Sequence, residues 1–357
     1  RVVEAMGERL HPASHLLLNE TAHMEGWAGD HELHAFNAFW DMDEILAANF
    51  MVFADVVERD AYDLWVGDEG WDLDYFLHEN PDLKAAPYAF LTDFIGFLPM
   101  RDDPASTEFK RAWEKNAENI DHLRLHPDVR DLSVMIGDPE DVLDRDFGPG
   151  LPNMRQWARE HFRFSGYTQH FDPAIYRDRA ALRRDLGYAD GERVILVSVG
   201  GTRVGRDLLK KCAEAFALAS PRLPDTRMVL VAGPRLDPGE LPSSPRLDVR
   251  PFVPHLFRHH AAADLAIVQG GLTTTMELAA LRTPFLYFPL RNHFEQQLFV
   301  SRRLERLGAG VRMDYDATRP EELAAAMLQH LGKPVHWGDV PTDGVERAAR
   351  MIAELMV

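Results

Sequence analysis

The sequence predicts an α/β fold in which two domains are each built on a parallel sheet. Short apolar segments typical of strands alternate along the chain with segments of helical periodicity, a pattern typical of βαβ units. The clearest of these strands, residues 194–199, is rich in valine and isoleucine, as expected for a strand buried on both faces. At 357 residues the chain is long enough for two domains with separate cores.

The first half of the chain is predicted to contain five strands and two long helical segments. The strands are expected at residues 16–18, 62–67, 88–92, 132–137 and 162–166. Helical periodicity covers residues 32–59 and 105–122, and the Gly/Pro-rich stretch 147–152 reads as a loop. We therefore predict a first domain over residues 1–168. Because the chain begins with an arginine, we expect one or more N-terminal strands of this domain to be missing.

The second half alternates more regularly and predicts a second domain over residues 169–335. Its strands are expected at residues 194–199, 228–233, 247–250, 264–268 and 284–288, and its helices at 206–219, 275–282, 295–307 and 319–331. A hinge is predicted near residues 166–190. Residues 336–357 are expected to form a C-terminal helix that packs back on the first domain.

Composition excludes several classes of protein. A single cysteine, Cys212, rules out a disulfide within the chain and is typical of a cytoplasmic protein. No uncharged apolar run approaches the roughly 20 residues of a membrane span. The net charge is −18, and residues 1–100 hold 20 Asp/Glu against 4 Lys/Arg. This acidic half disfavours nucleic acid and anionic lipid as partners and is compatible with a neutral or cationic one, but a solvated surface is the favoured explanation of the charge.

The most informative motif is the stretch from Val268 to Glu277, which continues to Pro284 and the glutamines at 296–297. It reads as a strand end, two glycines, and a helix that opens with three threonines. A helix N-terminus has free N–H groups and partial positive charge, and glycines let a ligand approach the backbone closely. The motif therefore predicts a phosphate site.

On these residues the chain resembles the donor-binding domain of GT-B glycosyltransferases. The resemblance covers residues 190–312, and the similar types are UDP-glycosyltransferases and the N-acetylglucosaminyltransferase that makes lipid II. It implies a GT-B fold of two Rossmann-like domains facing across a cleft. It also implies an inverting, metal-independent transfer of a sugar from a nucleotide diphosphate sugar, with uridine favoured over thymidine. The acceptor would be a small-molecule or lipid-linked hydroxyl.

The resemblance assigns roles to particular residues. Glu277 would bind the ribose, and Gln296 and Gln297 the transferred sugar. The two glycine turns would face the phosphates, through Gly200, Gly201, Thr202, Gly270, Gly271, Thr273 and Thr274. The loop at 251–255 would contact the base, through Phe252 and Val253. The chain has Gln269 and Val300 where the family often has histidine and asparagine. No cofactor beyond the nucleotide-sugar co-substrate is implied.

Each assignment has a simpler alternative. Thr274 to Glu277 also fits a capping box, in which Thr274 caps the helix and Glu277 reaches back to its N–H. Gln296 and Gln297 fit an ordinary helix start, and Thr202 fits a plain N-cap. The pairs His31–His34 and His255–His259 lack the further ligands that zinc requires, so we predict no metal.

The catalytic base has no clear candidate in the sequence. The family's usual histidine would lie upstream of Arg1, and among the acidic residues at strand ends we slightly prefer Asp93, because its apolar neighbours favour a raised pKa. A UDP-sugar 2-epimerase, a nucleotide-sugar hydrolase or a non-catalytic binder remains an alternative to the transferase.

Overall fold

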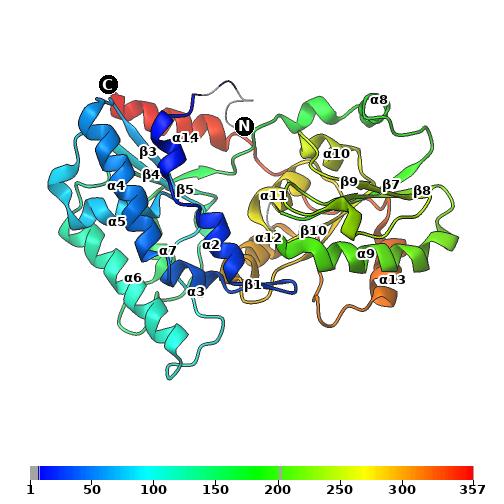
Figure 1. Ribbon diagram of the computed structural model, residues 1–357, viewed down its shortest axis with the longest axis horizontal. Helices are drawn as coiled ribbons and strands as arrows, with labels where there is room; N and C mark the ends of the chain where they lie inside the picture. The colour runs from blue at the N-terminus through cyan, green and yellow to red at the C-terminus, as the bar shows by residue number, and fades with distance from the viewer. Residues whose placement is uncertain (1–6, 8, 201–202, 357) are drawn as a thin grey trace. The chain divides into compact units, whose positions relative to one another are not determined.

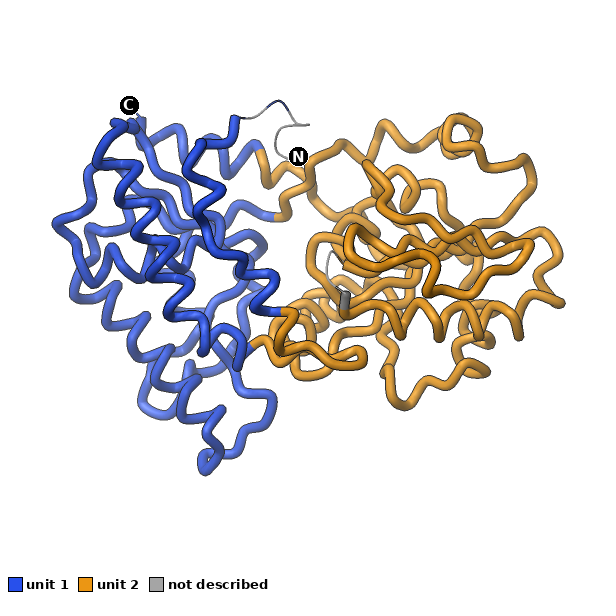
Figure 2. Tube along the Cα trace, in the orientation of Figure 1, with its two compact units in different colours: residues 1–24, 36–166, 346–357 blue, residues 25–35, 167–345 orange. Residues whose placement is uncertain are grey.

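The computed structural model describes residue 7, residues 9–200 and residues 203–356, which form two compact units (Figures 1 and 2). The first unit comprises residues 1–24, 36–166 and 346–357, and the second comprises residues 25–35 and 167–345. The chain therefore passes between units at Gly166–Tyr167, close to the predicted boundary at 168. Residues 25–35, which the sequence assigned to the first domain, belong to the second unit.

The first unit is built on a four-stranded parallel sheet. Its strands lie in the order β3 (Trp65–Asp68), β4 (Tyr88–Thr92), β5 (Leu132–Ile136) and β6 (Arg163–Gly166). Alternate residues of β4 face opposite sides of the sheet, as the two-residue period of a strand requires. Tyr88 and Phe90 pack under α4 (Asp43–Arg59) and α5 (Trp71–Glu79), whereas Ala89 packs against Met351 and its neighbours at the C-terminal end of the chain.

Two predictions for the first half are wrong. Residues 16–18 form no strand, since Leu16 ends the 3-10 helix η1 (Pro12–Leu16). The helical segment 32–59 is interrupted: a short hairpin of β1 (Ala28–Gly29) and β2 (Glu32–Leu33) precedes α3 (Ala35–Trp40), and α4 begins only at Asp43. The hairpin turn contains His31 at φ 46, a left-handed conformation that apolar periodicity does not reveal.

The other helices of the first unit cover its sheet and loops. They are α2 (Glu20–Gly26), whose last two residues fall in the second unit, α6 (Thr107–Leu125), α7 (Met154–His161) and α14 (Gly344–Ala353), which begins in the second unit. Helix α6 begins with Ser106, whose hydroxyl accepts a hydrogen bond from the N–H of Phe109. The predicted helix at 105–122 is thereby confirmed, with a longer C-terminal end.

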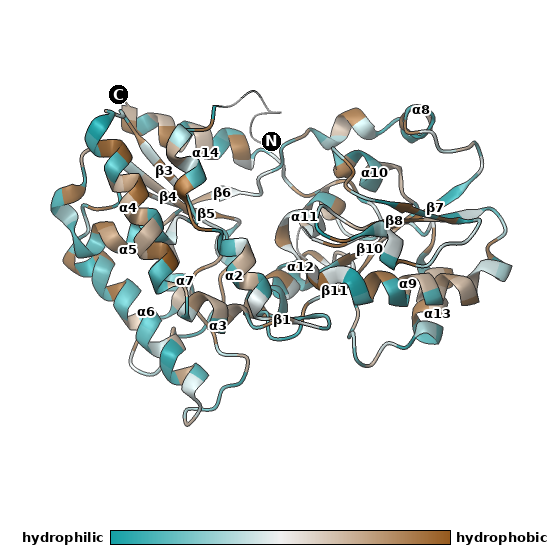
Figure 3. Ribbon diagram, viewed as in Figure 1, coloured by the Kyte–Doolittle hydropathy of each residue, from teal (hydrophilic) through white to brown (hydrophobic). Residues whose placement is uncertain are grey.

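The second unit is built on a six-stranded parallel sheet. The order is β12 (Val311–Arg312), β11 (Phe285–Phe288), β10 (Leu265–Gln269), β7 (Arg193–Ser198), β8 (Thr226–Val231) and β9 (Leu247–Arg250). All five strands predicted for this half are present within about two residues, and β12 is an addition. Figure 3 shows that the strands of this sheet are largely hydrophobic, whereas the helices around them carry both hydrophilic and hydrophobic residues.

Helices cover both faces of this sheet. Ile195 and Val197 of β7 face α9 (Arg206–Ala219) and α13 (Pro320–His330), while Leu196 faces α8 (Arg179–Asp185) and α10 (Leu256–Ala262). Helices α11 (Leu272–Ala280) and α12 (Ser301–Leu307) pack on β10 and β11. The helix predicted over 295–307 begins as a π-helical segment, η8 (Glu295–Val300), before it becomes α12.

This topology brings the predicted motifs to one edge. Strands β7, β10 and β11 are parallel neighbours, so their C-terminal ends lie side by side. Ligands of open α/β sheets collect at this edge. Within the described part of the chain, no helix is both long and apolar enough to cross a membrane.

Candidate donor site at the sheet edge of the second unit

Three loops meet at the C-terminal edge of the second sheet. The side-chain oxygen of Gln269, at the end of β10, accepts a hydrogen bond from the N–H of Gly200 at 3.2 Å, which joins the ends of β10 and β7. On the other side, a Cβ added to Gly270 would lie 2.9 Å from Cα of Pro289. Only glycine allows the loop after β10 to lie this close to the loop after β11.

Helix α11 starts at this junction without a side-chain cap. Its N-cap is Gly271, in an extended conformation, and no side chain of the described residues caps its first turn. The hydroxyl of Thr275 points back into the helix and donates to the carbonyl of Gly271 at 2.9 Å. Thr273 is exposed and Thr274 half-buried. The first turn of α11 therefore leaves N–H groups available to a ligand.

The capping-box alternative is wrong. It required Thr274 to be the N-cap, but Thr274 lies inside the helix, two residues after its first residue, Leu272. Glu277 consequently reaches no N-cap and lies in the second turn.

Glu277 instead faces two histidines that the sequence analysis did not select. Its carboxylate, in a side chain that is 9% exposed, lies 3.4 Å from Nδ1 of His260 and 3.8 Å from Nδ1 of His170. His260 is buried on α10, and its Nε2 lies 3.2 Å from the hydroxyl of Ser198 at the end of β7. These residues are far apart in the sequence, so no spacing could have revealed the cluster.

Gln269 supplies an unused donor beside the start of α11. The residue is 7% exposed, and its side-chain oxygen is held by Gly200 as described above. Its Nε2 is buried, and no described residue accepts a hydrogen bond from it. Because a buried N–H group without an acceptor costs about 1–3 kcal/mol, the position is suited to a ligand oxygen. The sequence showed Gln269 only as a departure from the family pattern.

The two glutamines of η8 differ in their contacts. The amide nitrogen of Gln297 donates to the carbonyls of Pro289 and Leu290, at 3.2 and 2.8 Å, and its oxygen accepts from Arg312. Gln297 therefore braces the loop after β11, and its amide is not free to hold a sugar. The buried Gln296 uses its oxygen to accept from the N–H of Leu290 at 2.9 Å, and no described residue accepts from its NH₂ group. Of the pair, only Gln296 keeps a group for a ligand.

The loop after β9 exposes one of the two residues predicted to contact the base and packs the other, half-buried, against the core. Phe252 is 54% exposed, whereas Val253 is packed against the core formed by α8 and α10. His255 closes the loop in a left-handed conformation, at φ 52. Phe252 is thus available to stack on a base and Val253 mainly holds the loop. Of the predicted interdomain loop, Gly200 is described, and Gly201 and Thr202 lie outside the described residues.

The acidic residues of the first unit give no clear base. Asp68 is the last residue of β3 and Asp93 directly follows the neighbouring strand β4; the N–H of Asp93 donates to the carboxylate of Glu69 at 3.4 Å. Asp68 is exposed and Asp93 half-buried. Nothing in this arrangement distinguishes Asp93 as a base. Among the described residues, no three His, Cys, Asp or Glu side chains are grouped to hold a metal ion.

Comparison with known proteins agrees with this arrangement. The glycosyltransferase family 28 C-terminal domain matches residues 194–335. A protein of Methanopyrus kandleri named uncharacterized glycosyltransferase is 34% identical over 181 residues, which are 49% of each chain. The UDP-N-acetylglucosamine–N-acetylmuramyl-(pentapeptide) pyrophosphoryl-undecaprenol N-acetylglucosamine transferase of Mycolicibacterium paratuberculosis is 32% identical over 189 residues, 50% of this chain and 45% of its own.

The chain spans about half the length of these curated relatives. Solved structures resemble it over nearly its whole length. The glycotransferase of kitacinnamycin has a TM-score of 0.56 at 18% sequence identity and covers 99% of this chain, which in turn covers 84% of that protein. This likeness confirms the predicted GT-B fold. The chain therefore shares the GT-B fold with these solved structures, and residues 194–335 of its second unit match the glycosyltransferase family 28 C-terminal domain.

Proposed function

We propose that the protein transfers a sugar, with inversion and without a metal ion, from a nucleotide diphosphate sugar to an acceptor hydroxyl. The observation that carries the proposal is the uncapped start of α11, which directly follows Gln269 and two glycines; Nε2 of Gln269 has no acceptor among the described residues. Free N–H groups, the positive end of the helix dipole and a buried donor together suit a diphosphate.

Other residues of the edge suit the rest of the donor. The carboxylate of Glu277 can accept from both hydroxyls of a ribose, and the free NH₂ group of Gln296 can donate to a hydroxyl of the sugar. The exposed ring of Phe252 offers a face to the base. We favour uridine and a small-molecule or lipid-linked acceptor. The transferase relative carries both UDP-N-acetylglucosamine and an undecaprenol-linked acceptor in its name.

The proposed reaction is a direct displacement at the anomeric carbon. The acceptor hydroxyl gives its proton to a general base and its oxygen bonds to the anomeric carbon, while the bond from that carbon to the diphosphate breaks. The electron pair leaves with the diphosphate, where the N–H groups of α11 and Nε2 of Gln269 stabilise the added charge. Such preorganised donors are worth several kcal/mol because they need no reorganisation during the reaction.

Incubation with UDP-N-acetylglucosamine alone tests the reaction class. We expect calorimetry to show binding of UDP, and chromatography to show an unchanged donor until a hydroxyl acceptor is added. Release of free UDP without an acceptor would identify a hydrolase, and conversion to a second UDP-sugar would identify an epimerase. Binding without turnover on any acceptor would indicate a binding protein. Each of these outcomes contradicts transfer.

The neighbouring glycines form a matched pair of substitutions. In Gly270→Ala the new Cβ would meet the backbone of Pro289 at 2.9 Å, so we expect the free energy of unfolding to fall by about 2 kcal/mol. In Gly271→Ala nothing lies within 4 Å and φ is −67, so stability should change by less than about 0.5 kcal/mol. UDP binding to Gly271→Ala should nevertheless weaken about tenfold, because the methyl group holds the phosphate away from α11. Unchanged affinity in calorimetry would show that Gly271 does not face the ligand.

A further inference from the structure

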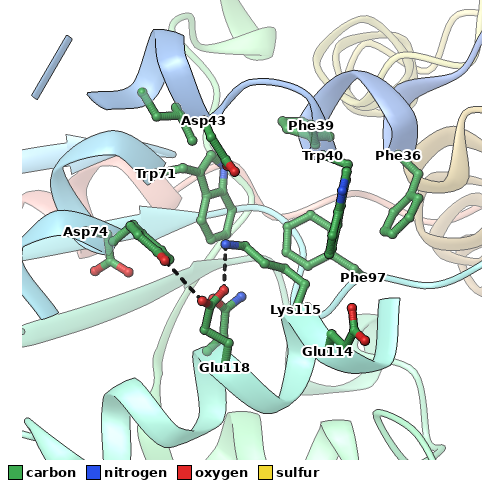
Figure 4. Close-up of a pocket in the computed structure, with 13 residues that line it drawn as sticks. Phe36, Phe39, Trp40, Asp43, Trp71, Asp74, Phe97, Glu114, Lys115 and Glu118 are labelled. Atoms are coloured by element: carbon green, nitrogen blue, oxygen red, sulfur yellow. Dashed lines mark hydrogen bonds and ion pairs between the residues drawn. The ribbon is translucent and has the colours of Figure 1, made fainter. Parts of the chain in front are cut away.

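The first unit contains a cavity of about 310 Å³ among its helices α3, α4, α5 and α6. Six aromatic residues line it: Phe36, Phe39, Trp40, Trp71, Tyr75 and Phe97. This volume is at the lower end of the roughly 300–1,000 Å³ of ligand pockets, and apolar walls with a few polar groups are typical of them. Figure 4 shows Asp43 on one side of the cavity and Lys115 and Glu118 of α6 on the other.

The polar groups of the cavity carry an excess of negative charge. Four carboxylates and one ammonium line it, from Asp43, Asp74, Glu114, Glu118 and Lys115. Asp74 is neutralised by a two-pronged ion pair with Arg130, and Glu118 by Lys115 at 2.8 Å. Asp43 and Glu114 have no hydrogen-bond or ion-pair partner among the described residues. Two unpaired negative charges therefore remain at the cavity, and a cation would complement them.

The aromatic faces of the cavity already hold cations. Nζ of Lys115 lies 4.3 Å from the centre of the Tyr75 ring, and the guanidinium carbon of Arg111 lies 4.9 Å from the centre of Trp40. Both distances are within the roughly 6 Å of a cation–π interaction. Phe36, on another part of the wall, has no cation at such a distance among the described residues.

We propose that this cavity binds an organic cation, namely an apolar or aromatic molecule that carries a protonated amine. The apolar part would lie among the rings, and the ammonium would lie near the carboxylates of Asp43 and Glu114. The cavity lies wholly within the first unit, so the inference stands apart from the donor site. That the bound amine is also the sugar acceptor rests on the proposed function.

Calorimetry with three probes of the same shape tests the charge preference. Phenylbutylamine, phenylbutanol and phenylbutanoate share an aromatic tail and differ in carrying a positive, no or a negative charge. We expect the amine to bind about tenfold more tightly than the alcohol, with a gap that narrows in high salt, and the carboxylate to bind weakest. Equal or tighter binding of the alcohol or the carboxylate, or no binding of the amine, would overturn the proposal.

Substitutions locate the site. The double variant Asp43→Asn/Glu114→Gln should reduce the affinity for the amine about fivefold and leave that for the alcohol unchanged, because both carboxylates are largely exposed and their attraction is partly screened. The matched control is Glu44→Gln/Asp121→Asn, which removes exposed carboxylates of the same two helices that do not line the cavity. Equal loss in both double variants would show that the amine responds to net charge alone.

The two proposals fail separately. Probe binding is measured without nucleotide, and UDP binding is measured without a probe. Loss of the charge preference would leave the donor site standing, and absence of UDP binding would leave the cation site standing.

Discussion

Glu277→Gln is expected to weaken UDP binding roughly 100-fold. A hydrogen bond to a charged group contributes about 1.5–3 kcal/mol, and the substitution both removes the charge and replaces one acceptor oxygen with a donor. A loss of about 3 kcal/mol corresponds to roughly two powers of ten in the dissociation constant. Calorimetric titration with UDP measures the effect directly.

The competing role of Glu277 is structural. Its carboxylate lies 3.4 Å from Nδ1 of the buried His260, so the residue could serve only to orient that ring. In that case Glu277→Gln would lower the melting temperature and leave the affinity for UDP unchanged. Glu214→Gln, on the exposed face of α9, is the matched control and should alter neither quantity.

The second unit is expected to lose stability as the pH falls from about 6.5 to about 4. Burial lowers the pKa of His31 and of His259 to about 4 from an ordinary value of 6.5. Between about pH 6.5 and pH 4 the unfolded chain therefore binds protons that the folded chain does not bind, so acid favours unfolding. Each pKa unit is worth about 1.4 kcal/mol, which gives an upper limit of about 3 kcal/mol for each histidine.

The surroundings of each ring explain the direction. His31 is fully buried and is stacked on Tyr315 with 4.1 Å between ring centres. Nδ1 of His259 lies 2.7 Å from the hydroxyl oxygen of Tyr188. In a neutral ring this nitrogen can accept a hydrogen bond from the hydroxyl. At either site a protonated imidazole would lose the hydration that it has in the unfolded chain, which lowers the pKa of the ring.

Urea unfolding from pH 7.5 to pH 4 measures this effect. The variants His31→Asn and His259→Asn cannot titrate, so their stability should depend less steeply on pH than that of the parent chain, whereas His336→Asn, which removes an exposed ring, should not change the slope. Asparagine tolerates the left-handed conformation of His31. The same slope in all four proteins would show that other groups govern acid unfolding.

The second unit was predicted from the sequence more accurately than the first, for a physical reason. Its strands are buried on both faces, so apolar runs such as residues 194–199 mark them directly. The N-terminal region lacks such runs. The long helical periodicity over 32–59 hides the turn at His31, whose position depends on contacts with Tyr315 and Arg291, which are 284 and 260 residues away in the sequence.

The candidate site was predictable where it rests on local conformation. The Gly270–Gly271 turn and the start of α11 follow from the residues themselves. The roles of Gln269, His170 and His260 depend on which loops the parallel sheet brings together. Gln297 was predicted to bind the sugar, because sequence spacing does not reveal its hydrogen bonds to the loop after β11. The aromatic cavity likewise gathers residues from four helices and leaves no signature in the sequence.

Comparing UDP with UMP in calorimetry tests the central claim, that the start of α11 and the amide of Gln269 hold a diphosphate. UDP carries the second phosphate that these donors would bind, whereas both nucleotides offer the same base and ribose. We predict that UDP binds at least about tenfold more tightly than UMP. Equal affinities would contradict the claim, because they would show that the uncapped helix contributes nothing to nucleotide recognition.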